Sequence, residues 1–477
     1  MTAEQLRNSI LQEAISGRLV PQDPNDEPAS ILLERLRKDF AELVKSKKII
    51  LSKPEKKAMM VAPKCDYDLP ENWSWCTLCD ISRVYGRIGF RGYTKLDLVN
   101  KKEDGAISLS PSNMKNGALD FSSCTYISNA KYEESPEIMV GNDDILIVKT
   151  GSSYGKVSHV TNLPWKSTIN PQIAIIKEIR VNAKYLFYAL QSPNARNKYE
   201  EFVLGTSIPT FSQENLLSMS VPLPPLAEQK RIVAKLEELL PIVEQYGKAQ
   251  KELDELNAAL PARLRQSILQ EAISGKLVPQ DSNEDAEDVK TIEIEDAPFE
   301  IPNNWRWCSL GDLVDMVSGT SYKKDDVRTK GVRILRGGNI VNDELVLAED
   351  DVFLPDEYAN LEKNIRKDDI IIVASTGSQK VIGKPALIRQ NYDKTQIGAF
   401  LRIIRAKDVK YVPFLWLIFK GMYYREHIRN LVKGTNINNI KEEYITTLPI
   451  PLPPLAEQKR IVAKIEELFE QINKITM

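Results

Sequence analysis

The sequence VPLPPLAEQKRIVAKLEELL, residues 221–240, occurs a second time as IPLPPLAEQKRIVAKIEELF, residues 450–469, with 17 of 20 positions identical. A proline cluster opens each copy, and because proline has a fixed φ and no N–H, it favours an extended lead-in and then a first helical position. Apolar residues follow at spacings of four, three and four from Ile232 to Val243, which is typical of a coiled-coil seam. We therefore expect a long helix that begins near Leu226 and ends near Pro261.

Two further stretches are duplicated. LRNSILQEAISGRLVPQD (6–23) recurs as LRQSILQEAISGKLVPQD (264–281) with 16 of 18 positions identical, and LPENWSWCTLCDI (69–81) returns as IPNNWRWCSLGDL (301–313). Self-similarity of this extent indicates a repeated architecture. The chain is therefore two copies of one plan, in the order short helix, globular domain, long helix. We expect the first short helix to pair with the last long helix, which would close the molecule around a pseudo-two-fold axis.

Between these motifs, residues 82–204 and 314–433 share only scattered identities. One short match survives, DDILIVKTGSS (143–153) against DDIIIVASTGS (368–378), which indicates a structural turn before a buried strand. One fold with two different surfaces is what two separate recognition tasks require. We expect two copies of one globular domain, joined by long antiparallel coiled-coil helices with a pseudo-two-fold internal repeat.

The first copy alone carries an additional segment that includes ILLERLRKDFAELVKSKKII (31–50), whose apolar spacing indicates an amphipathic helix. This helix either caps the first half of the protein or docks a partner, and we favour capping. The expected division of the chain is a repeat helix over 1–23, the additional segment and a linker over 24–68, a first globular domain over 69–221, a central helical region over 222–281, an acidic linker over 282–300, a second globular domain over 301–450 and a C-terminal repeat helix over 451–477.

Composition restricts the class of protein. No run of about 18 apolar residues is present, and the first residues lack the apolar region of a signal peptide, so we expect a cytoplasmic protein. Cys76 and Cys79 have C-x-x-C spacing, but the second copy has Cys308 and Gly311 there, so we expect ordinary buried cysteines and no metal site. The formal net charge of −2 is low for a nucleic-acid-binding protein, although basic side chains cluster in each domain.

Signals of catalysis are incomplete. The two histidines, His159 and His427, are too few for a histidine-based nuclease, and we expect both to be structural. GSSYGKV (151–157) has one residue too few between its glycines for a phosphate loop. NPQI (170–173) lacks the second proline and the aromatic residue of the Asn-Pro-Pro-aromatic loop of amino-methyltransferases.

A carboxylate and lysine site of the nuclease type is also conceivable, from Asp143 and Asp144 to Lys149. The second copy has Ala374 in place of Lys149, so such a site would exist in one half only. The sequence therefore predicts no catalytic residue and a protein that is not an enzyme.

These duplicated motifs resemble those of the specificity subunits of type I restriction-modification systems. PLPPLAEQKRIVAKLEEL, SILQEAISGKLVPQD and the P-x-N-W-x-W-C start of each globular domain occur in the order of that family, and the resemblance covers the whole chain. It implies that each globular domain is a target recognition domain of mixed α/β (α+β) fold that reads one half of a split, asymmetric DNA site. A structural scaffold that joins two protein-binding domains is the alternative, and it would bind its partners without any effect of DNA sequence.

The same resemblance implies the partners. The long helices would set the spacer between half-sites and dock two adenine methyltransferase subunits, and restriction subunits with translocase and nuclease activities would join the complex. S-adenosylmethionine, ATP and magnesium would belong to those subunits, with no cofactor in this chain. Two recognition domains related by a pseudo-two-fold axis would read half-sites about one helical turn of DNA apart.

Candidate DNA contacts follow from the chemistry of base readout. Arg and Lys suit guanine and Asn and Gln suit adenine in the major groove, while Ser, Thr and Lys contact phosphates. In the first domain the candidates are Arg87, Arg91, Tyr93, Ser110, Asn113, Lys149, Ser152, Ser153 and Tyr154. In the second domain they are Lys323, Arg333, Arg336, Asn339, Ser375, Thr376, Ser378, Gln379 and Lys380. The polar loops 205–207 and 434–436 are second-rank candidates.

Overall fold

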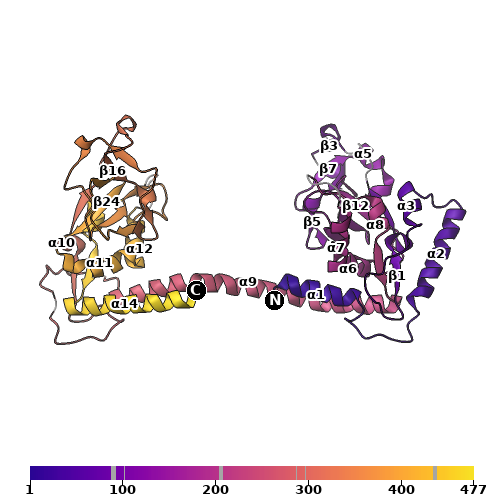
Figure 1. Ribbon diagram of the computed structural model, residues 1–477, viewed down its shortest axis with the longest axis horizontal. Coiled ribbons are helices and arrows are strands. Elements are labelled where there is room, and N and C mark those ends of the chain that lie inside the picture. Colours follow the sequence, from indigo (N-terminus) through magenta and orange to yellow (C-terminus); the bar gives the residue numbers. More distant parts are fainter. Residues whose placement is uncertain are drawn as a thin grey trace. The chain divides into compact units, whose positions relative to one another are not determined.

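The chain forms two compact units, Met1–Glu252 (unit 1) and Leu253–Met477 (unit 2) (Figure 1). The computed structural model describes residues 1–86, 93–100, 102–203, 208–285, 287–295, 297–432 and 438–476. The helices that arise from the duplicated motifs are α1 (Ala3–Ile15), α9 (Leu226–Ile273) and α14 (Leu455–Thr476). Each unit therefore contains a short helix, a globular domain and a long helix, as the duplication predicts.

The predicted end of the long helix near Pro261 is wrong, because α9 continues for 48 residues. A proline inside a helix leaves the carbonyl four residues earlier without its N–H partner. Pro241 is exposed and Pro261 is partly exposed, so water can hydrogen-bond to the carbonyls that they leave unpaired. The predicted short helix of the second copy is thus the C-terminal end of α9.

The expected pairing of the first short helix with the last long helix is also wrong. In unit 1, α1 runs antiparallel to the first part of α9, since Tyr246 Oη donates to Met1 O (2.9 Å) at one end and Gln22 Nε2 donates to Glu228 (2.6 Å) at the other. In unit 2, the end of α9 lies against α14, where Arg265 donates to the side chain of Asn473. Each short helix therefore pairs with the long helix of its own copy.

Short strand pairs at the base of each domain explain this pairing. They are β1 (Ser74–Thr77) with β13 (Ser220–Leu223) and β14 (Arg306–Ser309) with β26 (Pro449–Leu452), both antiparallel. Each pair joins the start of a domain to its end. The chain therefore enters and leaves a domain at one place, and the helix before the domain lies beside the helix after it.

Unit 1 contains two main sheets, with strand orders β10-β9-β12-β2 and β3-β7-β4-β11-β8. The first sheet is antiparallel, and in the second β4 and β11 are parallel. The strands are β2 (Arg83–Gly86), β3 (Leu98–Val99), β4 (Gly105–Leu109), β7 (Thr125–Ser128), β8 (Met139–Val140), β9 (Ile145–Val148), β10 (Val157–His159), β11 (Ser167–Ile169) and β12 (Ile173–Lys177), with a small hairpin of β5 (Met114–Lys115) and β6 (Ala118–Leu119).

Unit 2 repeats the first sheet in the order β22-β20-β24-β15, and it repeats the three central strands of the second sheet in the order β19-β16-β23, of which β16 and β23 are parallel. The strands are β15 (Val314–Ser318), β16 (Val332–Leu335), β19 (Val352–Leu354), β20 (Ile370–Val373), β22 (Pro385–Leu387), β23 (Thr395–Ile397) and β24 (Leu401–Ala406), with the pairs β17 (Ile340–Val341) with β18 (Glu344–Leu345) and β21 (Ser375–Thr376) with β25 (Asn438–Asn439). The expectation of one fold in two copies is confirmed.

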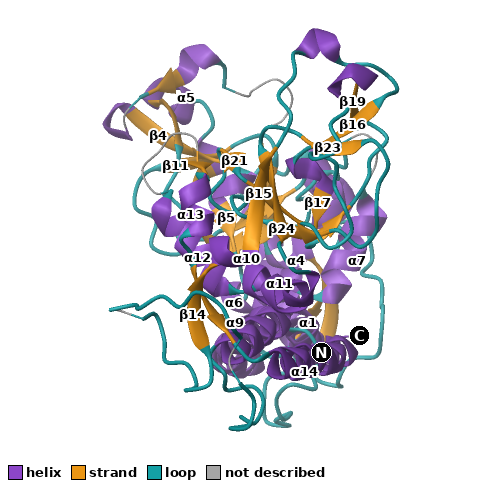
Figure 2. Cartoon of the chain, turned by 90° about the vertical axis from the view of Figure 1, so that its left-hand side faces the viewer, coloured by secondary structure: helices purple, strands orange, loops and turns teal. Residues whose placement is uncertain are grey.

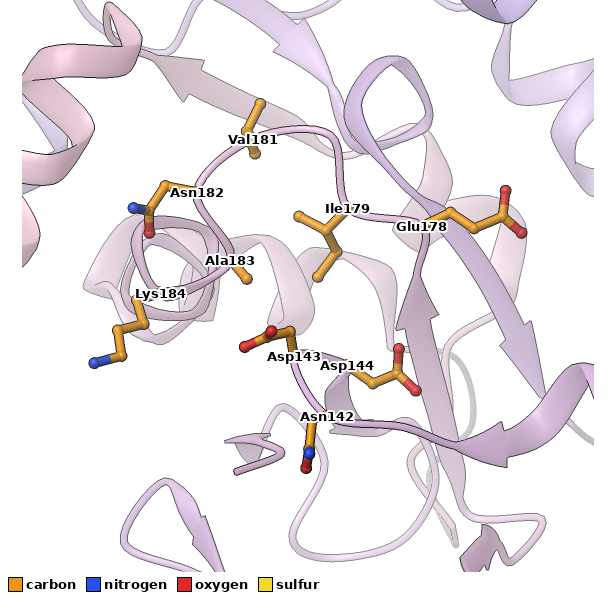
Figure 3. A pocket seen from close by; sticks show the side chains of 9 residues that line it. All are labelled: Asn142, Asp143, Asp144, Glu178, Ile179, Val181, Asn182, Ala183 and Lys184. Carbon is orange, nitrogen blue, oxygen red and sulfur yellow. The ribbon is translucent and has the colours of Figure 1, made fainter. Parts of the chain in front are cut away.

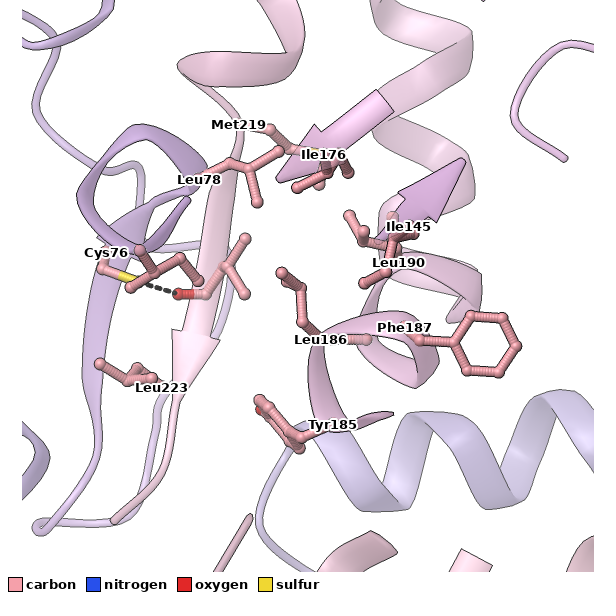
Figure 4. Packing of buried hydrophobic residues seen from close by; sticks show 14 of the residues in the cluster. Cys76, Leu78, Ile145, Ile176, Tyr185, Leu186, Phe187, Leu190, Met219 and Leu223 are labelled. Atoms are coloured by element: carbon pink, nitrogen blue, oxygen red, sulfur yellow. Dashed lines mark hydrogen bonds between the residues drawn. The ribbon is translucent and has the colours of Figure 1, made fainter. Parts of the chain in front are cut away.

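Continuous apolar runs mark the central strands because both faces of the sheet are covered. In β9, Ile145 and Ile147 belong to one buried cluster, and Leu146 and Val148 belong to another. The helix layer supplies one of these clusters, shown in Figure 4, and the second sheet supplies the other. Asp144 precedes β9 and accepts from Gly141 N (2.7 Å), which confirms a structural turn before a buried strand.

A layer of helices separates the sheets from the long helices in each unit. α6 and α7 lie beside α1 in unit 1, and α11 lies against α14 in unit 2 (Figures 1 and 2). The helices of the two domains are α4 (Leu78–Ile81), α5 (Asn129–Glu133), α6 (Ala183–Gln191), α7 (Pro193–Phe202), α8 (Gln213–Leu217), α10 (Leu310–Leu313), α11 (Val412–Lys420), α12 (Met422–Leu431) and α13 (Glu442–Thr446). The far ends of the sheets are therefore free of the long helices.

The additional segment of the first copy forms α2 (Ala29–Lys45) and α3 (Lys53–Ala58). Both helices contribute to the core of unit 1, and the guanidinium of Arg180 lies 4.3 Å from the centroid of the Phe40 ring in α2. Arg37 of α2 also pairs with Asp80 of α4 at 2.7 Å. This arrangement confirms the capping interpretation of the segment.

Cys76, Cys79 and Cys308 are buried, as expected, whereas Cys65 is exposed and Cys124 is partly exposed. All five cysteines are free, and burial raises the pKa of the Cys79 thiol to about 11. Burial also lowers the pKa of His159 and of His427. Among the described residues, no three His, Cys, Asp or Glu side chains are grouped so as to hold a metal ion, and no helix is long and apolar enough to cross a membrane.

A buried carboxylate joins the three duplicated motifs in each unit. Glu228 at the start of α9 accepts from Trp73 Nε1 (2.9 Å) and from Gln22 Nε2 (2.6 Å). Glu457 at the start of α14 accepts from Trp305 Nε1 and Gln280 Nε2 at the same two distances, 2.9 and 2.6 Å. The contact holds the short helix, the start of the domain and the long helix together, which explains why all three motifs occur in both copies.

The Glu228→Ala variant is expected to lower the free energy of unfolding of unit 1 by about 1–3 kcal/mol, because the buried Trp73 indole loses its acceptor. Urea denaturation of the full chain measures this loss, and Glu457→Ala is the matched change in unit 2. Glu237→Ala is the control, since its ion pair with Lys184 is about half exposed and contributes about 0.5 kcal/mol or less. Equal midpoints for Glu228→Ala and Glu237→Ala would contradict the expectation.

Candidate functional site

Three turns of unit 1 converge at one edge of its sheets. β4 and β11 are parallel, so the turns that follow them, which begin at Ser110 and Asn170, leave the sheet on the same side. Asn170 N donates to Leu109 O (2.8 Å) and fixes their spacing. The turn after β9 meets the second of these turns, because Lys149 N donates to Gln172 O (2.8 Å).

A fourth segment joins this edge through the turn after β9. Gly151 has a φ of +102°, in the left-handed region that favours glycine, and its N–H donates to Pro209 O (3.0 Å). The hydroxyls of Thr150 and Thr210 lie 2.8 Å apart. The four segments 110–113, 149–155, 170–172 and 208–210 are called the turn cluster of unit 1.

Lys149 is the most distinctive side chain of this cluster. It is partly buried, and burial lowers its pKa. Its ammonium group forms no ion pair and no side-chain hydrogen bond with another described residue. A partly buried cation without a carboxylate partner suits an anionic ligand such as a phosphate. Beside it Ser152 is exposed, and Ser153 and Tyr154 are partly exposed, with the Tyr154 ring against the core.

Unit 2 forms an equivalent cluster. Gly398 N donates to Leu335 O (2.8 Å), and Ala374 N donates to Phe400 O (2.8 Å). Ile440 N donates to Ala374 O (2.7 Å), and β21 pairs with β25 beside it. The turn cluster of unit 2 therefore comprises the segments 336–339, 374–380, 398–400 and 438–440.

Several predicted contacts lie in the cluster of unit 2. Ser375 and Thr376 are partly exposed in β21, and the turn that follows exposes Ser378, Gln379 and Lys380. Arg336 is exposed and pairs with Asp350 at 3.4 Å. Arg333 is more constrained, since it pairs with the buried Asp351 (3.1 Å) and lies 5.1 Å from the centroid of the Phe353 ring. Lys323 is exposed just beyond Thr320, whose N–H donates to Ile397 O (2.7 Å) next to the cluster.

Asn113 and Asn339 occupy the same place in the two units, and both are buried. The amide of Asn113 donates to two backbone carbonyls (3.1 and 2.9 Å), and that of Asn339 donates to Val346 O (3.0 Å) and Asp351 Oδ1 (2.6 Å). Their carbonyl oxygens accept from Ser110 N and Arg336 N. These side chains shape the turns after β4 and β16, so we assign them to positioning and not to base contact.

The remaining candidates are placed as follows. Tyr93 is partly exposed, at the start of a described stretch. Arg87 and Arg91, and the second-rank loops 205–207 and 434–436, lie outside the described residues.

Sequence reasoning missed Asn170, Gln172 and Phe400. Asn170 and Gln172 belong to the NPQI segment, whose only recognised likeness is to a methyltransferase loop. Phe400 lies in the equivalent turn of unit 2 and is 67% exposed. Each turn directly precedes an apolar strand, β12 or β24, that pairs with the DDILIV or DDIIIV strand. A polar or aromatic residue directly before each of these two strands was the feature of the sequence that could have identified these positions as candidate DNA contacts.

An acidic pocket of about 480 Å³ lies at the other end of β9 (Figure 3). Its lining residues are Asn142, Asp143, Asp144, Glu178, Ile179, Val181, Asn182, Ala183 and Lys184. The length of β9, about 13 Å, separates Asp144 from Lys149, so the conceivable carboxylate and lysine site does not form. The carboxylates that line the acidic pocket would repel DNA phosphates. The turn cluster is therefore the better candidate for a DNA-binding surface.

The chain is similar to known proteins along most of its length. The family model described as type I restriction modification DNA specificity domain matches residues 70–253 and 302–476. The type I restriction enzyme EcoAI specificity subunit of Escherichia coli is 28% identical, over 99% of this chain and 90% of that protein. The EcoEI specificity subunit of Escherichia coli is 25% identical over the same shares, 99% and 90%. A crystal structure of the HsdS subunit from Thermoanaerobacter tengcongensis has 19% identity and a TM-score of 0.49, and the match covers 86% of this chain and 92% of that one.

Proposed function

Since this chain belongs to the family of type I restriction-modification DNA specificity subunits, we propose that each of its units reads one half of a split, asymmetric DNA site. The chain is a DNA-recognition subunit and not an enzyme, and its partners are DNA and other subunits of a restriction-modification complex. The boundaries that we propose for the two target recognition domains are residues 69–221 and 301–450.

The turn clusters carry this proposal. Both units bring corresponding turns together at the same edge of the same fold, and the side chains there differ. Unit 1 has Lys149 and Gln172 where unit 2 has Ala374 and Phe400. Because base contacts depend on the donors, acceptors and apolar groups presented, two such surfaces should select different half-sites.

Within each cluster the residue types divide between two roles. Lys149, Ser152 and Ser153 suit phosphates in unit 1, as Lys380 and Ser378 do in unit 2. Gln379 suits a base edge, and Arg336 suits guanine once it releases Asp350. Arg87, Arg91 and Lys323 precede these clusters in the sequence and remain candidates for either role.

The long helices set the spacer and dock two adenine methyltransferase subunits in this proposal. Leu253, Leu256 and Leu260 of α9 are 51%, 54% and 47% exposed at spacings of three and four, which supports a helix that meets another protein. Restriction subunits complete the assembly. S-adenosylmethionine, ATP and magnesium are assigned to these partners, and the complex is placed in the cytoplasm with the DNA on which it acts.

Co-expression of this chain with the methyltransferase subunit from its own operon is expected to produce one gapped, asymmetric methylation motif. Long-read sequencing of the host DNA maps 6-methyladenine and thus the motif. Omission of this chain is the control and should abolish the motif. Co-purification of the two proteins without any motif would contradict the proposal and favour a structural scaffold.

A further inference from the structure

Gln172 and Phe400 present different chemistry at one structural position. Each residue directly precedes the central strand of its unit, and its carbonyl accepts from the residue after the neighbouring strand, Lys149 N or Ala374 N, both at 2.8 Å. Both side chains are exposed at the centre of a turn cluster. One is a hydrogen-bonding amide and the other an apolar ring.

The backbone that carries Phe400 is held on both sides. Its carbonyl accepts a second hydrogen bond from Ser375 N (3.1 Å), and Leu401 N donates to Gly398 O (2.9 Å). Leu401 itself is fully buried, and Arg402 Nη1 donates to Ala399 O (2.7 Å). The ring is thus a large apolar group on a rigid support, 67% exposed.

The surroundings of the ring narrow what it can recognise. Ser375 and Gln379 supply hydrogen-bonding groups in the same cluster, as major-groove readout requires. An apolar ring distinguishes bases in that groove through the thymine C5-methyl group, while a glutamine in the same position bonds to an adenine edge.

We propose that Phe400 is a specificity-determining residue that contacts the C5-methyl group of a thymine in the half-site read by unit 2, whereas Gln172 in unit 1 reads by hydrogen bonds. This inference rests on the proposed function, because it presumes that unit 2 reads a half-site. Insertion of the ring between base steps is a different use of an aromatic side chain, and it would not depend on the methyl group.

Deoxyuridine scanning tests the contact, because deoxyuridine removes the methyl group of thymine and leaves the Watson–Crick groups unchanged. The full chain in complex with its methyltransferase subunits is titrated with duplexes of the mapped motif by fluorescence anisotropy. One thymine of the second half-site should weaken binding about four-fold when replaced, which corresponds to one buried methyl group. The Phe400→Ala complex should bind the unmodified duplex at least four-fold more weakly and show no further loss with deoxyuridine there.

Two variants serve as controls. Phe400→Leu keeps an apolar group and should retain part of the response to deoxyuridine. This variant still tests the contact if Phe400→Ala fails to fold. Gln172→Ala should respond to deoxyuridine in the second half-site as the unaltered complex does and lose selectivity in the first half-site only.

The outcomes separate this inference from the proposed function. The inference would be overturned, and the proposed function left intact, if a gapped motif is found and the unaltered and Phe400→Ala complexes lose the same affinity when deoxyuridine replaces thymine. A second half-site without thymine on either strand would do the same. No preference of the complex for the mapped motif over a scrambled duplex would overturn both.

Discussion

Exchanging residues 82–204 for the same segment of another specificity subunit is expected to replace one half of the methylated DNA motif and to leave the other half unchanged. The described turns of the unit 1 cluster up to residue 172 lie inside this segment, while the strand pair β1 and β13 that closes the domain lies outside it. Binding to the original site should fall about 10³-fold or more, the usual ratio of specific to non-specific affinity. Mapping of 6-methyladenine measures the change.

The exchanged segment must supply the same contacts to the residues outside it that the original segment makes. Tyr185 Oη donates to Pro222 O (2.7 Å), and Asn182 N donates to the side chain of Gln229 at the start of α9 (2.9 Å). Arg83 forms a buried ion pair with Glu55 outside the segment. The matched control is exchange of residues 314–433, which should alter the other half-site alone. A change in both half-sites from either exchange would contradict independent reading by the two units.

The Glu55→Ala variant is expected to lower the free energy of unfolding of unit 1 by about 3–5 kcal/mol, as the loss of one partner from a buried ion pair typically does. Arg83 Nε and Nη2 donate to the two carboxylate oxygens of Glu55 at 2.6 and 3.1 Å, and the two side chains are only 10% and 2% exposed. Removal of the carboxylate leaves the buried guanidinium with only the partly exposed Glu178, 3.5 Å away, as its counter-charge. Urea denaturation of the full chain measures the loss.

Two further variants test the ion pair. Lys57→Ala is the surface control, because the pair of Lys57 with Glu214 is 67% and 44% exposed, and it should cost no more than about 0.5 kcal/mol. The double variant Glu55→Leu with Arg83→Met should recover most of the loss, since no buried charge remains. Failure of the double variant to exceed Glu55→Ala in stability would show that packing, and not the unpaired charge, causes the loss.

The same ion pair gives stability a pH dependence. Burial by itself raises the pKa of Glu55, but the hydrogen bonds from Arg83 and Ser52 outweigh it and lower that pKa overall. The folded state then binds fewer protons than the unfolded state, so the contribution is present above the unfolded pKa of about 4.3 and is lost as the pH falls through the folded value. The difference in stability from Glu55→Ala should therefore shrink in acid.

The order of elements was predictable because it depends on local pattern and on self-similarity, and the fold class followed from the resemblance of the duplicated motifs to a known family. The apolar spacing from Ile232 onward determines a helix, and the duplicated motifs contain the partners of Glu228 and Glu457. The continuous apolar run of β9 indicates a strand covered on both faces. The helix pairing was not predictable, because it follows from the distant strand pair β1 and β13.

The sequence by itself thus determined a duplicated chain with two similar domains and long helices, and its motifs carried the resemblance to DNA specificity subunits with α/β domains. Only the tertiary structure decided which side chains share a surface. Lys149 and Gln172 are distant in sequence and meet through the register of β9 with β12, while Asn113, polar and thus a plausible contact, is buried by the turn that folds over it. Strand register and burial depend on hydrogen bonds between segments far apart in the chain, and local sequence patterns carry little information about them.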